Sequence, residues 1–358
     1  MRVHNFCAGP CVLPEAILLE AQSEFVELNG SGMSLLEMSH RSPLYEEIHE
    51  AARARSKSVF GVPDDFEVLF IQGGAMLQFS MVPMNFLQGE AGAYVDAGSW
   101  GSKALADARM YGEAYAAWNG DDESPSRMPN QGEVEIRPGT RYLHVTSNET
   151  IGGVRMVEWP EVEVPMIGDM SSDYMSRPIP WDRFDLVYGG VQKNLGPAGM
   201  AVVFIRTSTL ENTSRNLGTY LRYDIHADNR SLFNTPPVFT IWMTGKMLKW
   251  IEDEGGLAEM EMRTKQRAAR IYDTIEASGG FYTSPVSRRD RSLTNVVFNL
   301  SNAEMETRFV AQAEKNDLVN LKGHRSVGGV RASLYNAMPM EGVEALVAFM
   351  HEFQRENG

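Results

Sequence analysis

Residues 184–199, FDLVYGGVQKNLGPAG, lead from a short apolar run through two glycines to Lys193 and then into a turn rich in glycine. The apolar run, 185–188, is typical of a buried β-strand, so Lys193 is expected where that strand ends. A lysine held there loses hydration, its pKa falls, and its free amine becomes a nucleophile. By itself, the stretch is equally compatible with a lysine that covers a sheet edge.

A second short apolar run, within residues 164–178 (VPMIGDMSSDYMSRP), ends in an acid, Asp169, 24 residues before Lys193. In an α/β sheet, ligands bind beyond the carboxyl ends of the strands, so the acid and the lysine can face one pocket. Pyridoxal phosphate needs this pair, because the lysine bonds to its aldehyde and a carboxylate keeps its pyridine nitrogen protonated. Asp169 could also cap the segment that follows it. The pair favours a pyridoxal phosphate site without requiring one.

Apolar runs of strand length alternate with helical patterns through the first part of the chain. Helices are expected at 14–28, from Ser42-Pro43 onward, and at 75–87. This alternation predicts an α/β fold with a mostly parallel central sheet covered by helices. Strands are expected at 66–71, 92–95, 142–145, 164–168, 185–188 and 200–205.

The pattern changes at Gly255-Gly256 and then predicts a smaller α/β domain with its own sheet. Its expected elements are a long helix (257–277), a strand (296–300), a helix (303–316), a strand (327–334) and a final helix. We therefore expect a large cofactor-binding domain over residues 14–256 and a small C-terminal domain over residues 257–358, on which residues 1–13 pack. Residues 120–132, acidic and rich in proline and asparagine, are expected to form a surface loop.

Composition limits the class of protein. The chain has 358 residues, of which 43% are hydrophobic and 22% charged, as in a globular protein with a large core. The formal net charge of −14 argues against nucleic acid as a partner, and no apolar run is long enough to span a membrane. With only Cys7 and Cys11, and no apolar signal segment, a reducing cytoplasm is expected, without a disulfide framework or a metal site.

Further polar and glycine-rich segments follow expected strands. Gly73-Gly74 precedes a helix whose first amides could bind a phosphate, Trp100 could lie against a heteroaromatic ring, and Thr150 could bond a ring oxygen. Asn234-Thr235, before two prolines, could also bond a phosphate. Each of these is also ordinary turn or core chemistry. In a chain of this charge, cationic residues near glycines suggest a dianionic substrate with a carboxylate: His40, Arg41, His324, Arg325 and Arg331.

Together these segments resemble the phosphoserine aminotransferases, pyridoxal-phosphate enzymes of fold type I. The resemblance covers nearly the whole chain, and the KGHR and RASLYNAMP parts are specific to this branch. Fold type I enzymes in general share only the aspartate, the lysine and the phosphate-binding turn. The segments that carry it are NFCAGP (5–10), SHR (39–41), QGGAMLQF (72–79), VPMNFL (82–87), YVDAGSW (94–100), SNETIGG (147–153), GGVQKNLGPAG (189–199), LFNTPP (232–237), KGHRSVGGVRASLYNAMP (322–339) and EGVEALVAFMHEF (341–353).

The resemblance implies a role for each candidate residue. Lys193 would be the residue that bonds to pyridoxal 5'-phosphate, and Asp169 would bond its ring nitrogen. Trp100 would stack on the ring, and Thr150 would bond the ring oxygen. The cofactor phosphate would be bound by the amides of Ala75 and Met76, by Gln192, and by Asn234 and Thr235 of the other subunit. The substrate carboxylate would be bound by Arg331, and its phosphate by His324 and Arg325 together with His40 and Arg41 of the partner subunit.

One position departs from the family's pattern. Many relatives carry a polar residue where this chain has Met76, so a main-chain contact would survive but a side-chain contact would be lost.

The implied reaction transfers the amino group of L-glutamate to 3-phosphohydroxypyruvate, giving O-phospho-L-serine and 2-oxoglutarate in a homodimer with shared active sites. Such enzymes also serve pyridoxine biosynthesis in some bacteria by aminating a phosphorylated four-carbon oxo acid, and no residue decides whether this one does. A desulfurase is a weaker alternative, because it would need a cysteine on a mobile loop, whereas Cys7 and Cys11 lie near the N-terminus. A binding protein without activity would retain Lys193, Asp169 and the arginines for no chemical reason.

Overall fold

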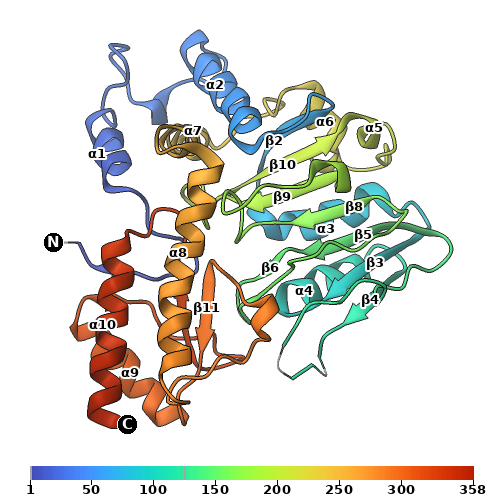
Figure 1. Cartoon of the computed structure of the whole chain (residues 1–358). Coiled ribbons are helices and arrows are strands. Elements are labelled where there is room, and N and C mark those ends of the chain that lie inside the picture. The colour runs from blue at the N-terminus through green and yellow to red at the C-terminus, as the bar shows by residue number, and fades with distance from the viewer. Residues whose placement is uncertain (1, 122, 125) are drawn as a thin grey trace.

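The computed structural model describes residues 2–121, 123–124 and 126–358, and a seven-stranded sheet lies at its centre (Figure 1). The strand order is β2-β10-β9-β8-β5-β3-β4. The pairs from β9 to β4 are parallel, and β10 runs antiparallel to both of its neighbours. The mostly parallel sheet of an α/β fold is thus confirmed. Its strands are β2 (Phe66–Gln72), β3 (Ala91–Asp96), β4 (Ala114–Asn119), β5 (Thr140–Thr146), β8 (Met166–Asp169), β9 (Leu186–Gly190) and β10 (Met200–Arg206).

Six of these strands lie where the apolar runs predict them, although β8 begins later than expected, and the seventh strand, β4, is not predicted. The sequence analysis does not predict β4, because its alanines give a weak strand signal, yet Tyr115 and Trp118 of this strand are buried. The expected strand at 164–168 begins later, at Met166, because Pro165 has no amide hydrogen to donate to a neighbouring strand.

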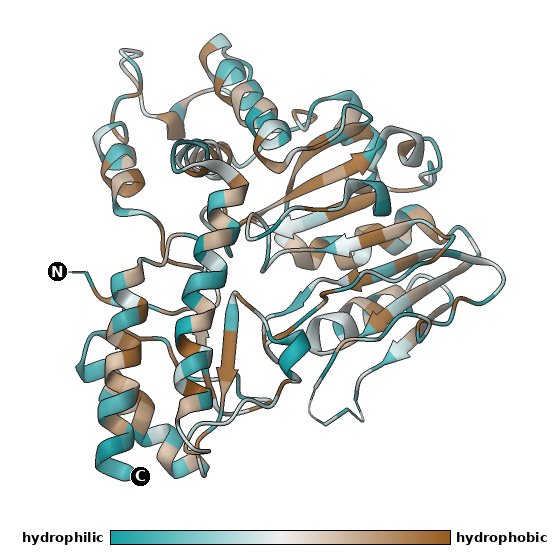
Figure 2. Cartoon of the chain, in the orientation of Figure 1, coloured by the Kyte–Doolittle hydropathy of each residue, from teal (hydrophilic) through white to brown (hydrophobic). Residues whose placement is uncertain are grey.

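The sheet is buried on both faces. Along β2, Val68 and Phe70 pack in one apolar cluster with α2 and α7, whereas Leu69 and Ile71 pack in another with α3 and α4. Two-sided burial explains why these strands are continuous apolar runs rather than alternating ones, and Figure 2 shows the central strands mainly in brown. The helices are α1 (Glu15–Ser23), α2 (Pro43–Phe60), α3 (Gly74–Phe86), α4 (Ser99–Ala108), α5 (Thr207–Leu210), α6 (Tyr223–Asp228), α7 (Val238–Asp253), α8 (Gly256–Ala277), α9 (Ala303–Lys315) and α10 (Met340–Asn357).

The first helix is shorter than expected. It ends at Ser23 rather than at residue 28, and Phe25, which suggested a longer apolar stripe, is 45% exposed, although Leu28 at the far end of that stripe is buried. A residue without a buried face to pack gains nothing from continuing the helix. Instead, the carbonyl of Phe25 accepts a hydrogen bond from the Ser34 hydroxyl, at 2.7 Å.

The C-terminal part has an apolar core of its own, between α8, α9, α10 and a small sheet of β11 (Asn295–Phe298) and β13 (Val330–Ser333). The strand expected at 327–334 is shorter, because Gly328 and Gly329 have positive φ angles of 71° and 70° that end the extended backbone. The N-terminal segment contributes to this core, since Phe6 is fully buried there and β1 (His4–Asn5) pairs with β12 (Leu318–Val319). The domain division at residue 256 stays a prediction.

The remaining elements are short. They are β6 (Asn148–Glu149), β7 (Val154–Arg155), η1 (Leu35–Glu37), η2 (Trp181–Arg183), η3 (Thr219–Leu221) and η4 (Arg288–Asp290). Within the described ranges, no helix combines the length and apolar character needed to cross a membrane.

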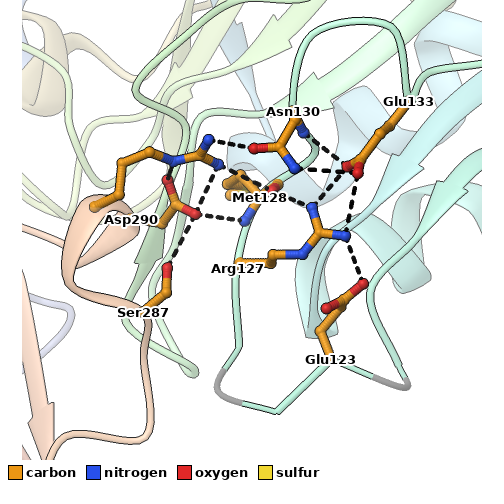
Figure 3. Close-up of polar contacts among 8 residues, drawn as sticks. Glu123, Arg127, Met128, Asn130, Glu133, Ser287 and Asp290 are labelled. Carbon is orange, nitrogen blue, oxygen red and sulfur yellow. Dashed lines mark hydrogen bonds and ion pairs between the residues drawn. The ribbon is translucent and has the colours of Figure 1, made fainter.

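The loop expected at 120–132 is only partly a surface loop, and its residues 122 and 125 lie outside the described residues. Met128 is 1% exposed, and its amide donates a hydrogen bond of 3.1 Å to the Asp290 carboxylate. Arg127 forms ion pairs with Glu123 and Glu133, and Figure 3 shows these pairs beside the contacts of Met128 and Asp290. The hydrogen bond between Met128 and Asp290 therefore connects the loop to the C-terminal part of the chain. The composition of the loop does not predict this contact.

Candidate active site

A cavity of about 310 Å³ lies at the carboxyl ends of β5, β8 and β9, between the first turns of α3 and α4. The parallel register sets Thr146 of β5 opposite Asp169 of β8, and Asp169 opposite Tyr188 of β9. The cavity therefore occupies the edge at which ligands bind in α/β sheets. Its lining residues are Pro10, Gly73, Gly74, Ala75, Met76, Phe79, Trp100, Thr146, Asn148, Thr150, Asp169, Ser171, Ser172, Gln192, Lys193, Ala198 and Gly199.

Lys193 lies in the turn between β9 and β10 and is 8% exposed. Its amine donates a hydrogen bond of 2.7 Å to the Thr150 hydroxyl. Burial lowers the pKa of Lys193 to about 8; the carboxylate of Asp169 opposes this shift, and the cation of Arg331 adds to it. A much larger fraction of this amine is therefore neutral near pH 8 than in a solvent-exposed lysine, and the neutral amine is the state that acts as a nucleophile or base.

Asp169 ends β8 and is 4% exposed. Its Oδ1 atom accepts hydrogen bonds from the amide and the hydroxyl of Ser171, at 2.9 and 2.6 Å. The Ser171 oxygen in turn accepts from the amide of Gly190, at 3.0 Å. Burial raises the pKa of Asp169, while the Ser171 bonds and the charge of Lys193 counteract part of that rise. Ser171, which no sequence pattern singles out, thus fixes the orientation of the Asp169 carboxylate.

A glycine turn, Gly73-Gly74, connects β2 to α3. Gly73 has φ of 96°, a conformation that favours glycine, and its amide donates to the carbonyl of Gly199 at 3.0 Å. A Cβ at Gly73 would lie 2.9 Å from the Leu77 side chain. As helix N-cap, Gly73 has no side chain to bond the first-turn amides, which include those of Ala75 and Met76 at the cavity. Such amides form an anion site.

Buried polar atoms at the cavity lack partners among the described residues. They are the indole nitrogen of Trp100, the hydroxyl of Thr146 and the amide oxygen of Asn148. Because buried polar groups are nearly always hydrogen-bonded in native proteins, these atoms point to a polar ligand in the cavity. An aromatic side chain, a lysine, an aspartate and a helix N-terminus around one cavity are the groups that pyridoxal phosphate requires, so the residues fit this cofactor.

The cationic residue Arg331 lies next to the cavity. One of its guanidinium nitrogens donates to the carbonyl of Thr150, at 3.3 Å, and burial lowers its pKa. Partial burial, followed by the positive charges of Arg331, Arg325 and Lys103, lowers the pKa of His324. The charges of Arg331, Arg325 and Lys103 thus all act on His324, and one of these residues, Lys103 of α4, is absent from the sequence prediction. Its amine lies 4.4 Å from the centroid of the Trp100 ring.

The predicted substrate-binding residues, including Arg331, do not line the cavity of this single chain, and neither do Asn234 and Thr235. His40 is 7% exposed, its Nε2 atom has no partner in the described part of the chain, and burial lowers its pKa. Arg41 beside it is exposed. Asn234 and Thr235 are also exposed, in the loop that precedes α7. Their expected roles require a second subunit and stay predictions.

The sequence analysis misses several polar residues of the cavity: Thr146, Asn148, Ser171 and Ser172. Weak signals for them exist, because the first two lie in or next to the quoted segment SNETIGG and the others lie two and three residues after Asp169. Serine, threonine and asparagine are common after strands, so these positions stand out only once the strands are placed side by side.

This chain is similar to known proteins along nearly its whole length. The family model for aminotransferase class V matches residues 3–346. The phosphoserine aminotransferase of Niallia circulans is 48% identical over 359 aligned residues, which cover 100% of this chain and 99% of that protein. The solved phosphoserine aminotransferase of Bacillus circulans subsp. alkalophilus has a TM-score of 0.97 and 48% identity, covering 100% of this chain and 99% of its own. For the pyridoxal-phosphate-bound enzyme of Trichomonas vaginalis the TM-score is 0.93 and the identity 34%, with 98% of this chain and 100% of the other covered. The chain therefore belongs to the class-V aminotransferases.

Proposed function

We infer that this chain is a phosphoserine aminotransferase, which uses pyridoxal phosphate to transfer the amino group of L-glutamate to 3-phosphohydroxypyruvate. The observation that carries the proposal is the buried Lys193 amine, held by Thr150 in one cavity with Asp169. Identity of 48% to phosphoserine aminotransferases over the full length supports the same substrates.

The residues around the cavity would hold each part of the cofactor. The amides of Ala75 and Met76 at the start of α3 would bind its phosphate, and the exposed Met76 side chain would not take part in this contact. Trp100 would hold its ring, Asp169 its ring nitrogen and Thr150 its ring oxygen. Once bound, pyridoxal phosphate supplies an aldehyde that bonds to amines and a protonated ring that draws electrons from the substrate.

Lys193 moves the proton. Because its pKa is about 8, the free amine can take the proton from the α-carbon of glutamate, and it would return that proton to the cofactor carbon that carried the aldehyde. Thr150 keeps the amine in the cavity through the 2.7 Å hydrogen bond. The Asp169 carboxylate would balance the positive charge of the protonated ring nitrogen. Pyridoxal phosphate would carry the amino group between the two substrates: glutamate would leave as 2-oxoglutarate with its keto oxygen supplied by water, and 3-phosphohydroxypyruvate would release its keto oxygen as water, receive the amino group and leave as O-phospho-L-serine.

The cations select the substrate. Arg331 binds the carboxylate that both substrates share, whereas His324 and Arg325 bind the phosphate together with His40 and Arg41 of the partner subunit. A homodimer is part of this proposal. It is supported by exposed apolar side chains beside the segments that would cross between subunits, with Leu36 at 53% and Phe233 at 43% exposure.

A cytoplasmic location is also part of the proposal, and the free thiols Cys7 and Cys11 support it.

The proposal is tested by absorbance and by half-reactions. Purified protein given pyridoxal phosphate should keep a visible absorbance band after dialysis, and Lys193→Ala should lose it, while the exposed control Lys265→Ala should keep it. The band should disappear with glutamate and return faster with 3-phosphohydroxypyruvate than with hydroxypyruvate. A protein that stays colourless refutes the cofactor assignment, and equal rates with both acceptors refute the phosphate site.

A further inference from the structure

Glu149 is a fully buried acid beside the cavity, and the mechanism above gives it no role. It ends β6, directly before Thr150. Its two carboxylate oxygens accept hydrogen bonds from two backbone amides that are 48 and 49 residues away in the chain. Oε2 accepts from the amide of Trp100 at 3.0 Å, and Oε1 from the amide of Gly101 at 2.7 Å.

These two amides belong to the first turn of α4, where backbone donors have no partner within the helix. A helix usually satisfies them with the side chain of its own N-cap residue. The N-cap here is Gly98, which has no side chain. The side chain of Glu149, on β6, accepts hydrogen bonds from these amides instead. A negative charge at this end of a helix is also favoured by the helix dipole.

The backbone around the carboxylate is shaped to admit it. A Cβ at Gly98 would lie 2.9 Å from the carboxyl carbon of Glu149, so any larger residue would push the carboxylate away. Gly101 is equally constrained, because a Cβ there would lie 2.8 Å from the carbonyl oxygen of Val95. The two glycines therefore serve close approach rather than an unusual backbone conformation.

The contact links both sides of the cofactor cavity. Trp100 contributes its ring from α4, and Thr150 contributes its hydroxyl from the residue after Glu149. The Lys193 amine lies 5.3 Å from the centroid of the Trp100 ring and 2.7 Å from the Thr150 oxygen. One carboxylate thus sets the distance between the stacking surface and the hydroxyl that holds the lysine.

Burying this carboxyl is unfavourable for its charged form. Burial raises the pKa of Glu149 to about 7, and the two amide bonds oppose that rise. A residue with only a capping function could lie at the surface, where desolvation is absent, as Glu341 does in the first turn of α10. The buried position is therefore better explained by the cavity than by the helix.

We propose that Glu149 is a positioning residue for the cofactor, because its carboxylate fixes the first turn of α4, and with it the Trp100 ring, relative to Thr150 and Lys193. The inference rests on the proposed function, since it concerns the same cavity. Its consequence is that cofactor affinity depends on Glu149 through Trp100.

The test measures the dissociation constant of pyridoxal phosphate by titrating cofactor-free protein. In Glu149→Gln one oxygen becomes an NH₂ group that faces a backbone N–H, so a charge-assisted hydrogen bond is lost and the dissociation constant should rise about tenfold. Trp100→Ala should also weaken binding, and Glu149→Gln should add less than about twofold in that background. In the absence of cofactor, the peptide that contains Trp100 and Gly101 should exchange its amide hydrogens faster in Glu149→Gln than in the wild-type protein.

Two further variants separate positioning from general stability. Gly98→Ala leaves the carboxylate in the chain but displaces it, and should reproduce the weaker binding if Glu149→Gln does not fold. Glu341→Gln, at an exposed helix N-terminus, should bind the cofactor as the wild type does. Independent, additive effects of Glu149→Gln and Trp100→Ala, or unchanged binding in both Glu149→Gln and Gly98→Ala, overturn this inference alone. Failure of the wild-type protein to bind the cofactor overturns the proposed function and the inference with it.

Discussion

Replacing Ser171 with alanine should damage both the fold and the cofactor site, although sequence reasoning passes over this residue. The Ser171 hydroxyl is a link between two buried groups: it donates to Asp169 at 2.6 Å and accepts from the Gly190 amide at 3.0 Å. Ser171 is 8% exposed, so water does not replace it freely. Ser171→Ala removes the link without adding bulk.

The size of the effect follows from the two bonds. A hydrogen bond to a charged group contributes about 1.5–3 kcal/mol, and a buried amide left without an acceptor costs about 1–3 kcal/mol. Because the site can relax in part, we expect the free energy of unfolding of the cofactor-free protein to fall by roughly 2–4 kcal/mol. Urea unfolding followed by circular dichroism measures this difference.

The effect should depend on pH. The pKa of Asp169 is raised by burial, so the folded state favours its protonated form, and the stability due to that preference is lost as pH rises through the raised pKa. The Ser171 bonds oppose the loss by stabilising the carboxylate. The destabilisation caused by Ser171→Ala should therefore be larger at pH 8 than at lower pH, where a smaller fraction of Asp169 is ionised.

A matched control is available in the same segment. Ser176 is also buried, and its hydroxyl donates to the carbonyl of Asp173 at 2.8 Å rather than to a carboxylate. Ser176→Ala should cost about 1 kcal/mol with no dependence on pH. If Ser171→Ala were no more destabilising than Ser176→Ala, or if its cost were the same at both pH values, the assigned role of Ser171 would be wrong.

Three more substitutions test other parts of the molecule. Arg331→Gln should raise KM about a hundredfold for both glutamate and the phosphorylated acceptor, because about 3 kcal/mol of charge-assisted binding to their shared carboxylate is lost; an unchanged KM in steady-state assays would remove Arg331 from the substrate site. Arg325→Ala should raise KM for 3-phosphohydroxypyruvate about tenfold and leave that for glutamate unaltered; equal changes for the two would argue against a phosphate contact. Asp290→Asn should lower the free energy of unfolding by about 2–3 kcal/mol, because the 1%-exposed carboxylate bonds the Met128 amide and pairs with Arg289, and an unchanged urea midpoint would contradict this.

Much of the sheet and the two central site residues could be predicted because their signals are local. A strand buried on both faces is an uninterrupted apolar run, as at β9 and β10, and a glycine-rich turn marks its end. Asp169 stands out because a charged residue directly after such a run is unusual, and Lys193 because it follows another run through two glycines. The same reasoning fails at β4, whose alanines give little strand signal, and at Phe25, whose apolar side chain is not buried in this chain.

The supporting residues could not be predicted, because nothing local distinguishes them. Ser171 and Thr146 are ordinary polar residues of turns and strand ends until the parallel pairing of β5 and β8 places Thr146 opposite Asp169. The opposite case is that of His40, Arg41 and Asn234-Thr235. The resemblance assigns these residues to the site, but in this single chain they do not line the cavity.

The sequence by itself determined most of the strands and helices, which charged groups are present, and the family to which the chain belongs. Only the tertiary structure decided what those groups do. Lys193 has a pKa of about 8 because the fold buries it, an effect that Arg331 adds to and Asp169 opposes, and Glu149 reaches the amide of Trp100 across 49 residues of chain. The physical reason is that strand and helix patterns reflect short-range geometry, whereas burial and hydrogen-bond partners depend on which distant segments the fold brings together.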